Sequence, residues 1–457
     1  MKKTVVIDVV GLSSSLIGMH TPFLQAYVKR NHLNTITPMV PAVTTAVQST
    51  YVTGEWPAEH GIVGNGWYDR AECEVKFWKQ SNKLVESPKI WDKARKLDPA
   101  FTCSKMFWWY NMYSTADYSV TPRPDYLSDG RKMPDCYAHP SSLRDHLQKE
   151  LGTFPLFQFW GPGANIRSTQ WIADASIITD NLYDPTLTLI YLPHLDYCLQ
   201  KFGQDLTRIS KELGEVDAVC KQLVEFYEQK GCEVIILSEY GITNVNHPIH
   251  LNRIFREEGL IAIREERGLE LLDAGASKAF VVADHQIAHV YVNDPASYKK
   301  VRSIVENTPG VQVVLDREGK RKHNMHHSRS GELILMADAD SWFTYYYWLD
   351  DAKAPDFARL VDIHRKPGYD PVEMFMNPAD PLIKMKAGFK LLKKKLGFRY
   401  LMNVIPLDAT LIKGSHGRIT ENSAYHPVLI TNKALATPQV QATDVYHVIW
   451  DALTKAL

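Results

Sequence analysis

Three runs of aliphatic and β-branched residues dominate the hydrophobic pattern of the chain. They cover residues 4–10, 186–192 and 232–237, and a turn containing Gly, Pro or polar residues follows each. Short apolar runs of this kind are typical of parallel strands that are buried on both faces. We therefore predict three central strands here, with further strands at residues 279–293 and 332–337.

Other segments show apolar positions at helical spacing. The clearest is 205–230, where Gly231 ends the pattern. Its apolar face comprises Leu206, Ile209, Leu213, Val216, Cys220 and Val224. Helices are also expected at 20–29, 46–54, 384–399 and 444–457. Strands that alternate with helices predict an α/β fold with a central, mostly parallel sheet and helices on both faces.

The domain organisation follows from where this alternation is interrupted. Residues 353–411 break the pattern with a polar stretch and a lysine-rich helix, so we interpret them as an inserted cap. Residues 1–352 and 412–457 then form one catalytic core. A lysine run is more often a solvated helix face than a binding patch, and we assign it that role here.

Each of the three predicted central strands delivers an acid at its carboxyl end. These acids are Asp8, Asp196 and Glu239. Open α/β sheets place their chemistry at this edge. Because unpaired buried charges are costly, three converging carboxylates indicate ligands for a cation.

A nearly uncharged stretch, residues 41–54, begins a helix at Thr44. The free N–H groups of a helix start, together with a hydroxyl, favour an anion. An ordinary threonine N-cap would give the same pattern, so this segment alone decides nothing. The aromatic run 107–110 is likewise open between core packing, which we favour, and the wall of a pocket.

Composition narrows the function classes. The chain has 457 residues, 45% of them hydrophobic and 23% charged, with 52 basic and 52 acidic residues and a formal net charge of zero. Neither a nucleic acid nor a membrane partner is expected on global charge. The six cysteines form no CxxC pair, and Asp8 interrupts the first apolar run, which we interpret as a strand rather than a targeting segment. We expect a cytoplasmic protein.

Taken in chain order, these pieces resemble a known family. The motifs are Asp8, the Thr44 helix leading to Val52-Thr53-Gly54, then Pro57 and His60-Gly61-Ile62, then Asp196, Ser238-Glu239-Tyr240-Gly241, and Gly414-Ser415-His416-Gly417. Their order and spacing resemble the alkaline phosphatase superfamily, in particular the type I phosphodiesterase/nucleotide pyrophosphatase family, with phosphonoacetate hydrolase a near relative.

The resemblance implies a hydrolase of phosphoric ester or anhydride bonds that acts on a small phosphate ester or nucleotide-like molecule. Thr44 would be the nucleophile between two divalent ions, zinc first, with Mn²⁺ and Mg²⁺ as alternatives. The implied metal ligands are Asp8, Thr44, Asp196, Gln200, Glu239, Tyr240 and His416, with His364 as the first choice for an added ligand. The implied substrate-binding residues are Gln48, Asn65, Arg365 and Arg418.

Three positions depart from the family pattern. Gln200 and Tyr240 stand where histidine ligands are expected, and Val47 stands where relatives carry an asparagine that binds phosphoryl oxygen. His250, His285 and His327 are further histidines that could complete the site.

These departures leave alternatives open. One is a catalytically silent or ligand-binding member of the fold, and another is a phosphomonoesterase or phosphonate hydrolase. A sulfatase is disfavoured, because residues 44–48 lack the Cys or Ser context that formylglycine formation needs.

Overall fold

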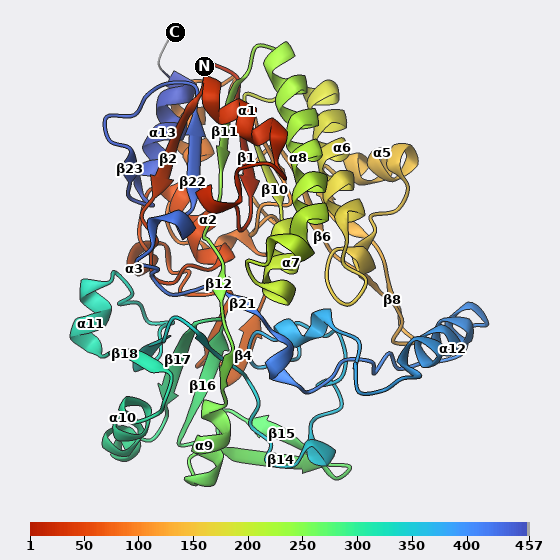
Figure 1. Ribbon diagram of the computed structural model, residues 1–457, viewed down its shortest axis with the longest axis vertical. Coiled ribbons are helices and arrows are strands. Elements are labelled where there is room, and N and C mark those ends of the chain that lie inside the picture. Colours follow the sequence, from red (N-terminus) through yellow and green to blue (C-terminus); the bar gives the residue numbers. More distant parts are fainter. Residues whose placement is uncertain (455–457) are drawn as a thin grey trace.

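The α/β fold class is confirmed by the structure, a computed structural model that describes residues 1–454. A nine-stranded sheet forms its centre, in the order β23-β2-β22-β11-β1-β10-β5-β6-β9 (Figure 1). These strands are β23 (Gln439–Val440), β2 (His32–Ile36), β22 (Val428–Thr431), β11 (Glu233–Leu237), β1 (Thr4–Val9), β10 (Leu187–Leu192), β5 (Cys103–Met106), β6 (Tyr118–Pro122) and β9 (Cys136–His139). From β11 to β6 the strands are parallel, whereas β22 and β9 run antiparallel to their neighbours.

Two groups of helices flank this sheet (Figure 1). One group is α1 (Pro22–Arg30), α5 (Ser141–Leu151), α6 (Ile166–Tyr183), α7 (His194–Phe202) and α8 (Leu206–Gln229); the other is α2 (Thr44–Thr53), α3 (Pro57–His60) and α13 (Asp444–Thr454). A further helix is α4 (Ile90–Leu97). The helix expected at 444–457 is present to Thr454, and residues 455–457 lie outside the described part of the chain. No helix among the described residues is long and apolar enough to cross a membrane.

A second lobe is built around a four-stranded antiparallel sheet. Its strands are β16 (Ala279–Asp284), β17 (Ile287–Val292), β19 (Leu333–Ala337) and β18 (Val311–Leu315), with helices α9 (Leu251–Glu257), α10 (Tyr298–Glu306), α11 (Arg317–Lys322) and α12 (Ile383–Lys395) nearby. Two-stranded pairs complete the fold: β3 (Gly66–Asp69) with β4 (Glu74–Phe77), β7 (Asp125–Tyr126) with β8 (Lys132–Met133), β12 (Thr243–Asn244) with β21 (Gly414–Ser415), β13 (His247–Ile249) with β20 (Ser341–Phe343), and β14 (Ala262–Glu266) with β15 (Leu269–Asp273).

The second lobe has its own hydrophobic cluster, and the predicted insertion packs into it. Phe357, Tyr369 and Val404 from residues 353–411 join Phe280 and Trp342 there. Residues 353–411 thus share one hydrophobic interior with residues 245–352. The division into a catalytic core and an inserted cap stays a prediction.

Helix α2 is buried along its whole length although it is rich in hydroxyl side chains. Two of those hydroxyls bond back within the helix: Ser49 Oγ donates to the Thr45 carbonyl and Thr53 Oγ1 to the Ser49 carbonyl, both at 2.7 Å. Because these two hydroxyl groups donate to carbonyl groups of the same helix, they can be buried in the core without an unpaired donor. Gly54 ends the helix with a φ of 72°, where an added Cβ would lie 2.9 Å from the ring of Tyr446.

The turn after α3 depends on a buried histidine. His60 Nδ1 accepts from the N–H of Ile62 at 3.1 Å, so Nε2 carries the proton toward Thr50 Oγ1 at 3.0 Å. Burial lowers the pKa of His60 to about 3. The neutral imidazole therefore holds α2 to the segment that leads to Asn65.

Replacing His60 should flatten the acid side of the stability profile. Its pKa is lower in the folded than in the unfolded state, so its stabilisation is complete above about pH 6.5 and is lost as pH falls toward 3. Between about pH 7 and pH 5 the wild type should lose roughly 2 kcal/mol more than His60→Gln, measured by urea denaturation. Equal losses in both proteins would contradict the buried neutral state.

Candidate functional site

The three strand-end acids converge, as the sequence predicts. In the sheet register Asp8 on β1 lies beside Tyr191 of β10 and Leu237 of β11. Glu239 follows β11 by two residues, and Asp196 lies in the first turn of α7. All three side chains are buried.

Gln48 joins two of these acids. Its Nε2 donates to Glu239 Oε1 at 2.6 Å and to Asp8 Oδ2 at 3.3 Å, while its Oε1 accepts from the backbone N–H of Trp109 at 2.8 Å. The amide orientation is fixed by that backbone donor. Gln48 was predicted to bind substrate, but its amide is already occupied by protein groups in this structure.

Thr44 and Asp196 meet through Tyr240. The phenol oxygen of Tyr240 lies 2.9 Å from Thr44 Oγ1 and donates to Asp196 Oδ1 at 3.3 Å. Gln200, one helical turn after Asp196, donates to Asp196 Oδ2 at 2.7 Å, and its Oε1 accepts from the Tyr369 hydroxyl at 2.9 Å. Gln200 and Tyr240, the two departures from the family pattern, thus act as neutral donors to one carboxylate.

Two histidines stack at this site. The ring of His416 lies 3.6 Å from that of Tyr240 and 3.8 Å from that of His285, which in turn stacks on Tyr369 at 3.7 Å. His416 Nδ1 donates to the carbonyl of Ala42 at 2.7 Å. Its Nε2 therefore carries a lone pair, has no hydrogen-bond partner and lies 3.6 Å from Asp196 Oδ1.

Asn65 and Asp284 form a hydrogen-bonded pair beside the start of α2. Asn65 Oδ1 accepts the N–H of Thr45 at 3.1 Å, and Asp284 accepts from both the backbone and the side chain of Asn65 at 2.7 and 3.1 Å. Val47 packs in the hydrophobic core, so the side-chain amide that contacts the first turn of α2 here is that of Asn65, through the N–H of Thr45. Asp284 also accepts from His285 Nδ1 at 2.9 Å.

Sequence reasoning missed Asp284 and ranked His285 below His364. The available signal was a β-branched run ending in Asp284-His285, the same strand-end pattern used for the other acids. His285 occupies the tight turn between β16 and β17 with a φ of 63°, a left-handed conformation that few residues adopt. That hairpin carries the side chain from the second lobe to the site.

The remaining predicted residues lie away from this network. His364 lines the pocket described below, but its Nδ1 lies 3.2 Å from the carbonyl of Phe77. Arg365 pairs with Asp356 at the surface, and Arg418 donates to Gln312 at 2.6 Å. His250 bonds Thr344 and His327 bonds Glu86. The structure therefore gives the two arginines no contact with Thr44.

Burial dominates the electrostatics. It raises the pKa of Asp196 and of Glu239 to about 7, and it raises the pKa of Asp8 with help from neighbouring Glu239. Among the described residues no lysine or arginine forms an ion pair with Asp8, Asp196 or Glu239. The acids must therefore hold protons or share a cation.

The site has two halves, one with Asp8 and Glu239 and the other with Asp196 and His416, and they differ in the ligands that they offer a cation. Asp8 Oδ1 and Glu239 Oε2 are buried without a hydrogen-bond partner, beside the Thr44 hydroxyl, and such oxygen donors fit one hard cation. On the other side only Asp196 and His416 remain as ligands of the expected kind. Within residues 1–454 no group of three or more His, Cys, Asp and Glu side chains is arranged to hold a metal ion.

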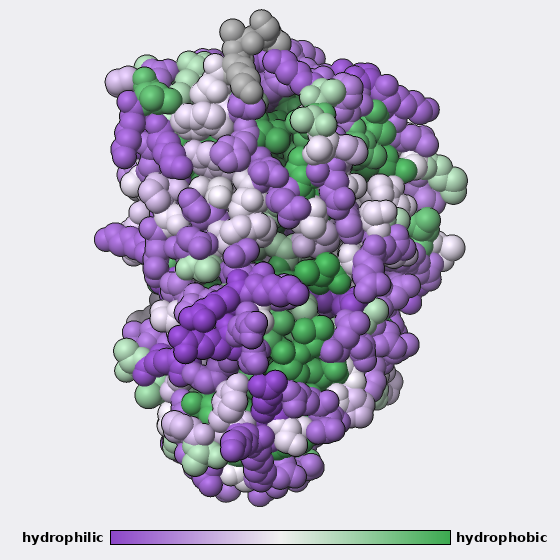
Figure 2. Space-filling model, turned by 90° about the vertical axis from the view of Figure 1, so that its left-hand side faces the viewer, coloured by the Kyte–Doolittle hydropathy of each residue, from purple (hydrophilic) through white to green (hydrophobic). Residues whose placement is uncertain are grey.

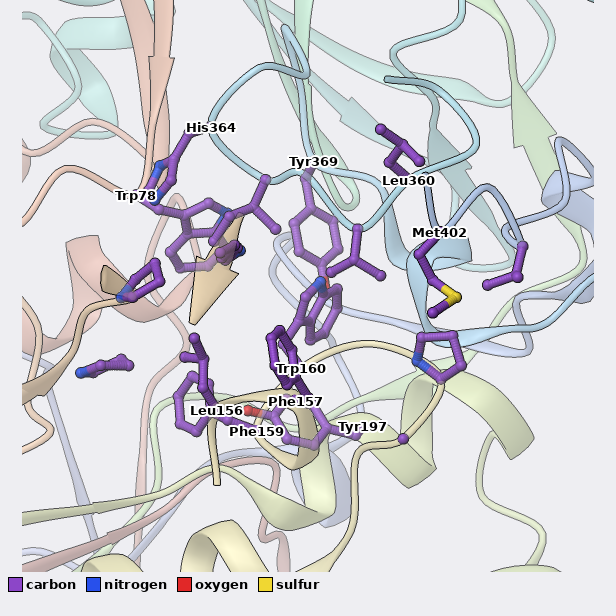
Figure 3. Close-up of a pocket in the computed structure, with 18 of the residues that line it drawn as sticks. Trp78, Leu156, Phe157, Phe159, Trp160, Tyr197, Leu360, His364, Tyr369 and Met402 are labelled. Carbon is purple, nitrogen blue, oxygen red and sulfur yellow. The ribbon is translucent and has the colours of Figure 1, made fainter. Parts of the chain in front are cut away.

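Thr44 is one of the residues that line an aromatic pocket of about 440 Å³. Figure 3 shows the aromatic side chains of Trp78, Trp160 and Tyr369 gathered around it. Its walls include Trp78, Trp109, Phe159, Trp160, Tyr197 and Tyr369. Trp160 is fixed by donating its indole N–H to Glu373 at 2.6 Å, and Glu373 pairs with buried Lys366. Both interpretations of residues 107–110 thus apply, because Trp109 lines the pocket while Phe107, Trp108 and Tyr110 pack in the core.

Comparison with known proteins identifies the family. The model of the family described as type I phosphodiesterase / nucleotide pyrophosphatase matches residues 4–370. The chain belongs to this family. Type I phosphodiesterases and nucleotide pyrophosphatases are hydrolases of phosphoric ester or anhydride bonds and generally depend on divalent metal ions.

Two fungal proteins are among the relatives of this family member. An uncharacterised pyrophosphatase/phosphodiesterase of Schizosaccharomyces pombe is 26% identical over 253 residues, which are 51% of this chain and 44% of that protein. Ectonucleotide pyrophosphatase/phosphodiesterase 2 of Saccharomyces cerevisiae is 24% identical over 386 residues, 79% of this chain and 68% of that protein. The chain thus spans less than half the length of the fission yeast relative.

Solved structures show the same fold. Phosphonoacetate hydrolase from Sinorhizobium meliloti, in complex with phosphonoformate, has a TM-score of 0.61 at 13% identity and covers 99% of this chain and 96% of its own. Murine ectonucleotide pyrophosphatase/phosphodiesterase 5, an inactive variant in complex with AMP, has a TM-score of 0.59 at 14% identity, covering 100% and 96%.

Removing the Tyr240 hydroxyl should destabilise the protein. Tyr240→Phe keeps the ring on His416 but takes a donor from Asp196 and a partner from Thr44, at a cost of about 1 to 3 kcal/mol in urea denaturation. Tyr345→Phe is the matched control, because the buried Tyr345 hydroxyl has no hydrogen-bond partner. Equal effects of the two substitutions would show that Tyr240 does not link the site.

Proposed function

We propose that the protein hydrolyses a small phosphoric ester or anhydride with Thr44 as its nucleophile. The observation that supports this most is the position of Thr44. Its hydroxyl faces the pocket at the start of α2, bonded to Tyr240 and backed by the buried acids. A helix start favours the negative charge of a phosphoryl group at this point.

The nearby residues offer a route for the proton of Thr44. As Oγ1 attacks phosphorus and the leaving group departs, the hydroxyl proton passes to Tyr240, whose own proton passes to Asp196. A carboxyl with a pKa of about 7 is suited to take a proton near neutral pH. The leaving oxygen departs with the electron pair of the broken P–O bond and takes a proton from solvent. Water then attacks the phosphothreonine and releases one proton to solvent as the bond from phosphorus to Thr44 Oγ1 breaks. The proton held by Asp196 returns through Tyr240 to Oγ1.

Asp8 and Glu239 would hold one divalent cation. When bound, such an ion lowers the pKa of a coordinated hydroxyl and offsets phosphoryl charge. Oxygen donors favour Mg²⁺ or Mn²⁺ over zinc. The two-zinc arrangement implied by the resemblance remains a prediction, and the filled Asp196 half of the site favours a single hard ion.

The pocket suits a ligand with a flat or apolar group next to its phosphate. Its aromatic walls would cover that group, while Thr44, Asp196 and His285 line the polar end. The AMP and phosphonoformate complexes of structural neighbours support small phosphorus-containing ligands here. A cytoplasmic location also remains a prediction.

A second candidate is a ligand-binding member that has lost catalysis. Gln48, Gln200 and Tyr240 place neutral donors on all three acids. Those hydrogen bonds hold the site together without a cation. Such a protein would bind a phosphate ester in the aromatic pocket and leave it intact.

The nucleophile can be tested with an aryl phosphodiester. Thr44→Ala should lower kcat/KM for bis(4-nitrophenyl) phosphate by at least about a thousandfold, assayed with Mg²⁺ or Mn²⁺. Thr53→Ala is the control, since Thr53 is buried in the same helix and bonds only within it and to the next turn. Its activity should stay within a few-fold of wild type.

Two outcomes would contradict the proposal. Undiminished turnover in Thr44→Ala would exclude Thr44 as the nucleophile. No turnover in the wild type, with the reporter nevertheless protecting the protein against thermal unfolding, would favour the silent, ligand-binding alternative.

A further inference from the structure

Helix α12 and the residues after it concentrate positive charge in a chain whose net charge is zero. Residues 383–399 contain no Asp or Glu and seven basic residues. These are Lys384, Lys386, Lys390, Lys393, Lys394, Lys395 and Arg399. Of the helix lysines whose side chains the structure describes, only Lys386 forms an ion pair, with Asp380.

Helix α12 and the residue that follows it expose an apolar stripe. Met385, Phe389, Leu392 and Leu396 are 63%, 58%, 50% and 63% exposed. Their spacing of four, three and four residues places them on one side of a helix. At 100° per residue, Lys386 and Lys393 flank this stripe on one side and Lys384 and Lys395 on the other.

The opposite side of α12 is attached to the protein. Ala387 is buried in the hydrophobic cluster of the second lobe, and Lys390 hydrogen-bonds to Asn403. The apolar stripe therefore faces solvent and is not the side of α12 that packs against the hydrophobic core. Figure 1 shows α12 projecting from the body of the molecule. Figure 2 shows the side away from α12, where hydrophilic side chains predominate.

We propose that this face of α12 docks on an anionic phospholipid surface. An apolar stripe flanked by lysines on both sides matches a helix that lies in a membrane interface, with its apolar side chains among the acyl chains and its lysines at the headgroups. Nucleic acid would use the lysines but leave the exposed Leu and Phe side chains in water. Leu382, Phe398 and Leu401, which precede or follow α12 in the chain, are also exposed apolar side chains.

Docking would bring the pocket close to the lipid surface. Leu391 on α12, together with Leu401 and Met402, forms part of the pocket wall. The membrane contact and the pocket therefore share one segment of chain. The docking proposal does not depend on hydrolysis, so its test stands apart from that of Thr44.

Vesicle sedimentation tests the proposal directly. The wild type should bind phosphatidylcholine vesicles containing about 30 mol% phosphatidylglycerol at least about tenfold more tightly than pure phosphatidylcholine vesicles, and high salt should weaken that binding. Equal binding to both vesicles, or binding to neither, would overturn it.

Two matched sets of variants locate the surface. Phe389→Ser with Leu392→Ser, and separately Lys384→Glu, Lys393→Glu and Lys395→Glu together, should each reduce vesicle binding at least about tenfold. The controls are Met19→Ser with Leu97→Ser, and Lys83→Glu, Lys299→Glu and Lys322→Glu together, all at exposed positions elsewhere. Unchanged melting temperatures would confirm folding.

Equal losses in the control variants would overturn the assignment to α12. Sedimentation velocity will show whether the protein is a dimer. A dimer that only the α12 variants dissociate, and whose loss accounts for all of their reduction in vesicle binding, would also overturn the assignment. Stoichiometric binding of α12 to an acidic protein such as calmodulin, with no binding to anionic vesicles, would likewise replace the membrane by a protein partner.

Discussion

The site depends on the burial of three carboxyl groups that form no ion pair with a lysine or arginine in the described part of the chain. Asp8, Asp196 and Glu239 reach one place because parallel strands of a sheet end at the same edge. Burial disfavours the ionised form of each carboxyl group and so raises its pKa. Each group must therefore be protonated, accept hydrogen bonds or bind a cation. Gln48 donates hydrogen bonds to Asp8 and Glu239, and Tyr240 donates one to Asp196.

The same constraint explains the departures from the family pattern. At these two positions the amide of Gln200 and the phenol of Tyr240 donate to Asp196 directly. The Asp196 half is thus stable with no ion present. The Asp8 and Glu239 half keeps two unpartnered oxygens, and this asymmetry is the basis for proposing one cation rather than two.

Much of the fold followed from hydrophobic periodicity, because buried strands and long amphipathic helices impose strong local patterns. The positions of the strand-end acids and of Thr44 could also be predicted from the sequence, since each is set by the local pattern of its own strand or helix. Asp284 and His285 were harder, because a hairpin of the second lobe brings them in through contacts distant in sequence. The roles suggested for His364, Arg365 and Arg418 stay predictions. Their printed contacts are with Phe77, Asp356 and Gln312, although His364 lines the same pocket as Thr44.

The position of a bound cation tests this account most directly. In crystals soaked with Mn²⁺, the account predicts one strong anomalous peak within bonding distance of Asp8 Oδ1 and Glu239 Oε2, with Gln200 still bonded to Asp196. Two peaks of equal strength, with the second between Asp196 and His416, would contradict it. So would a peak at the Asp196 half alone.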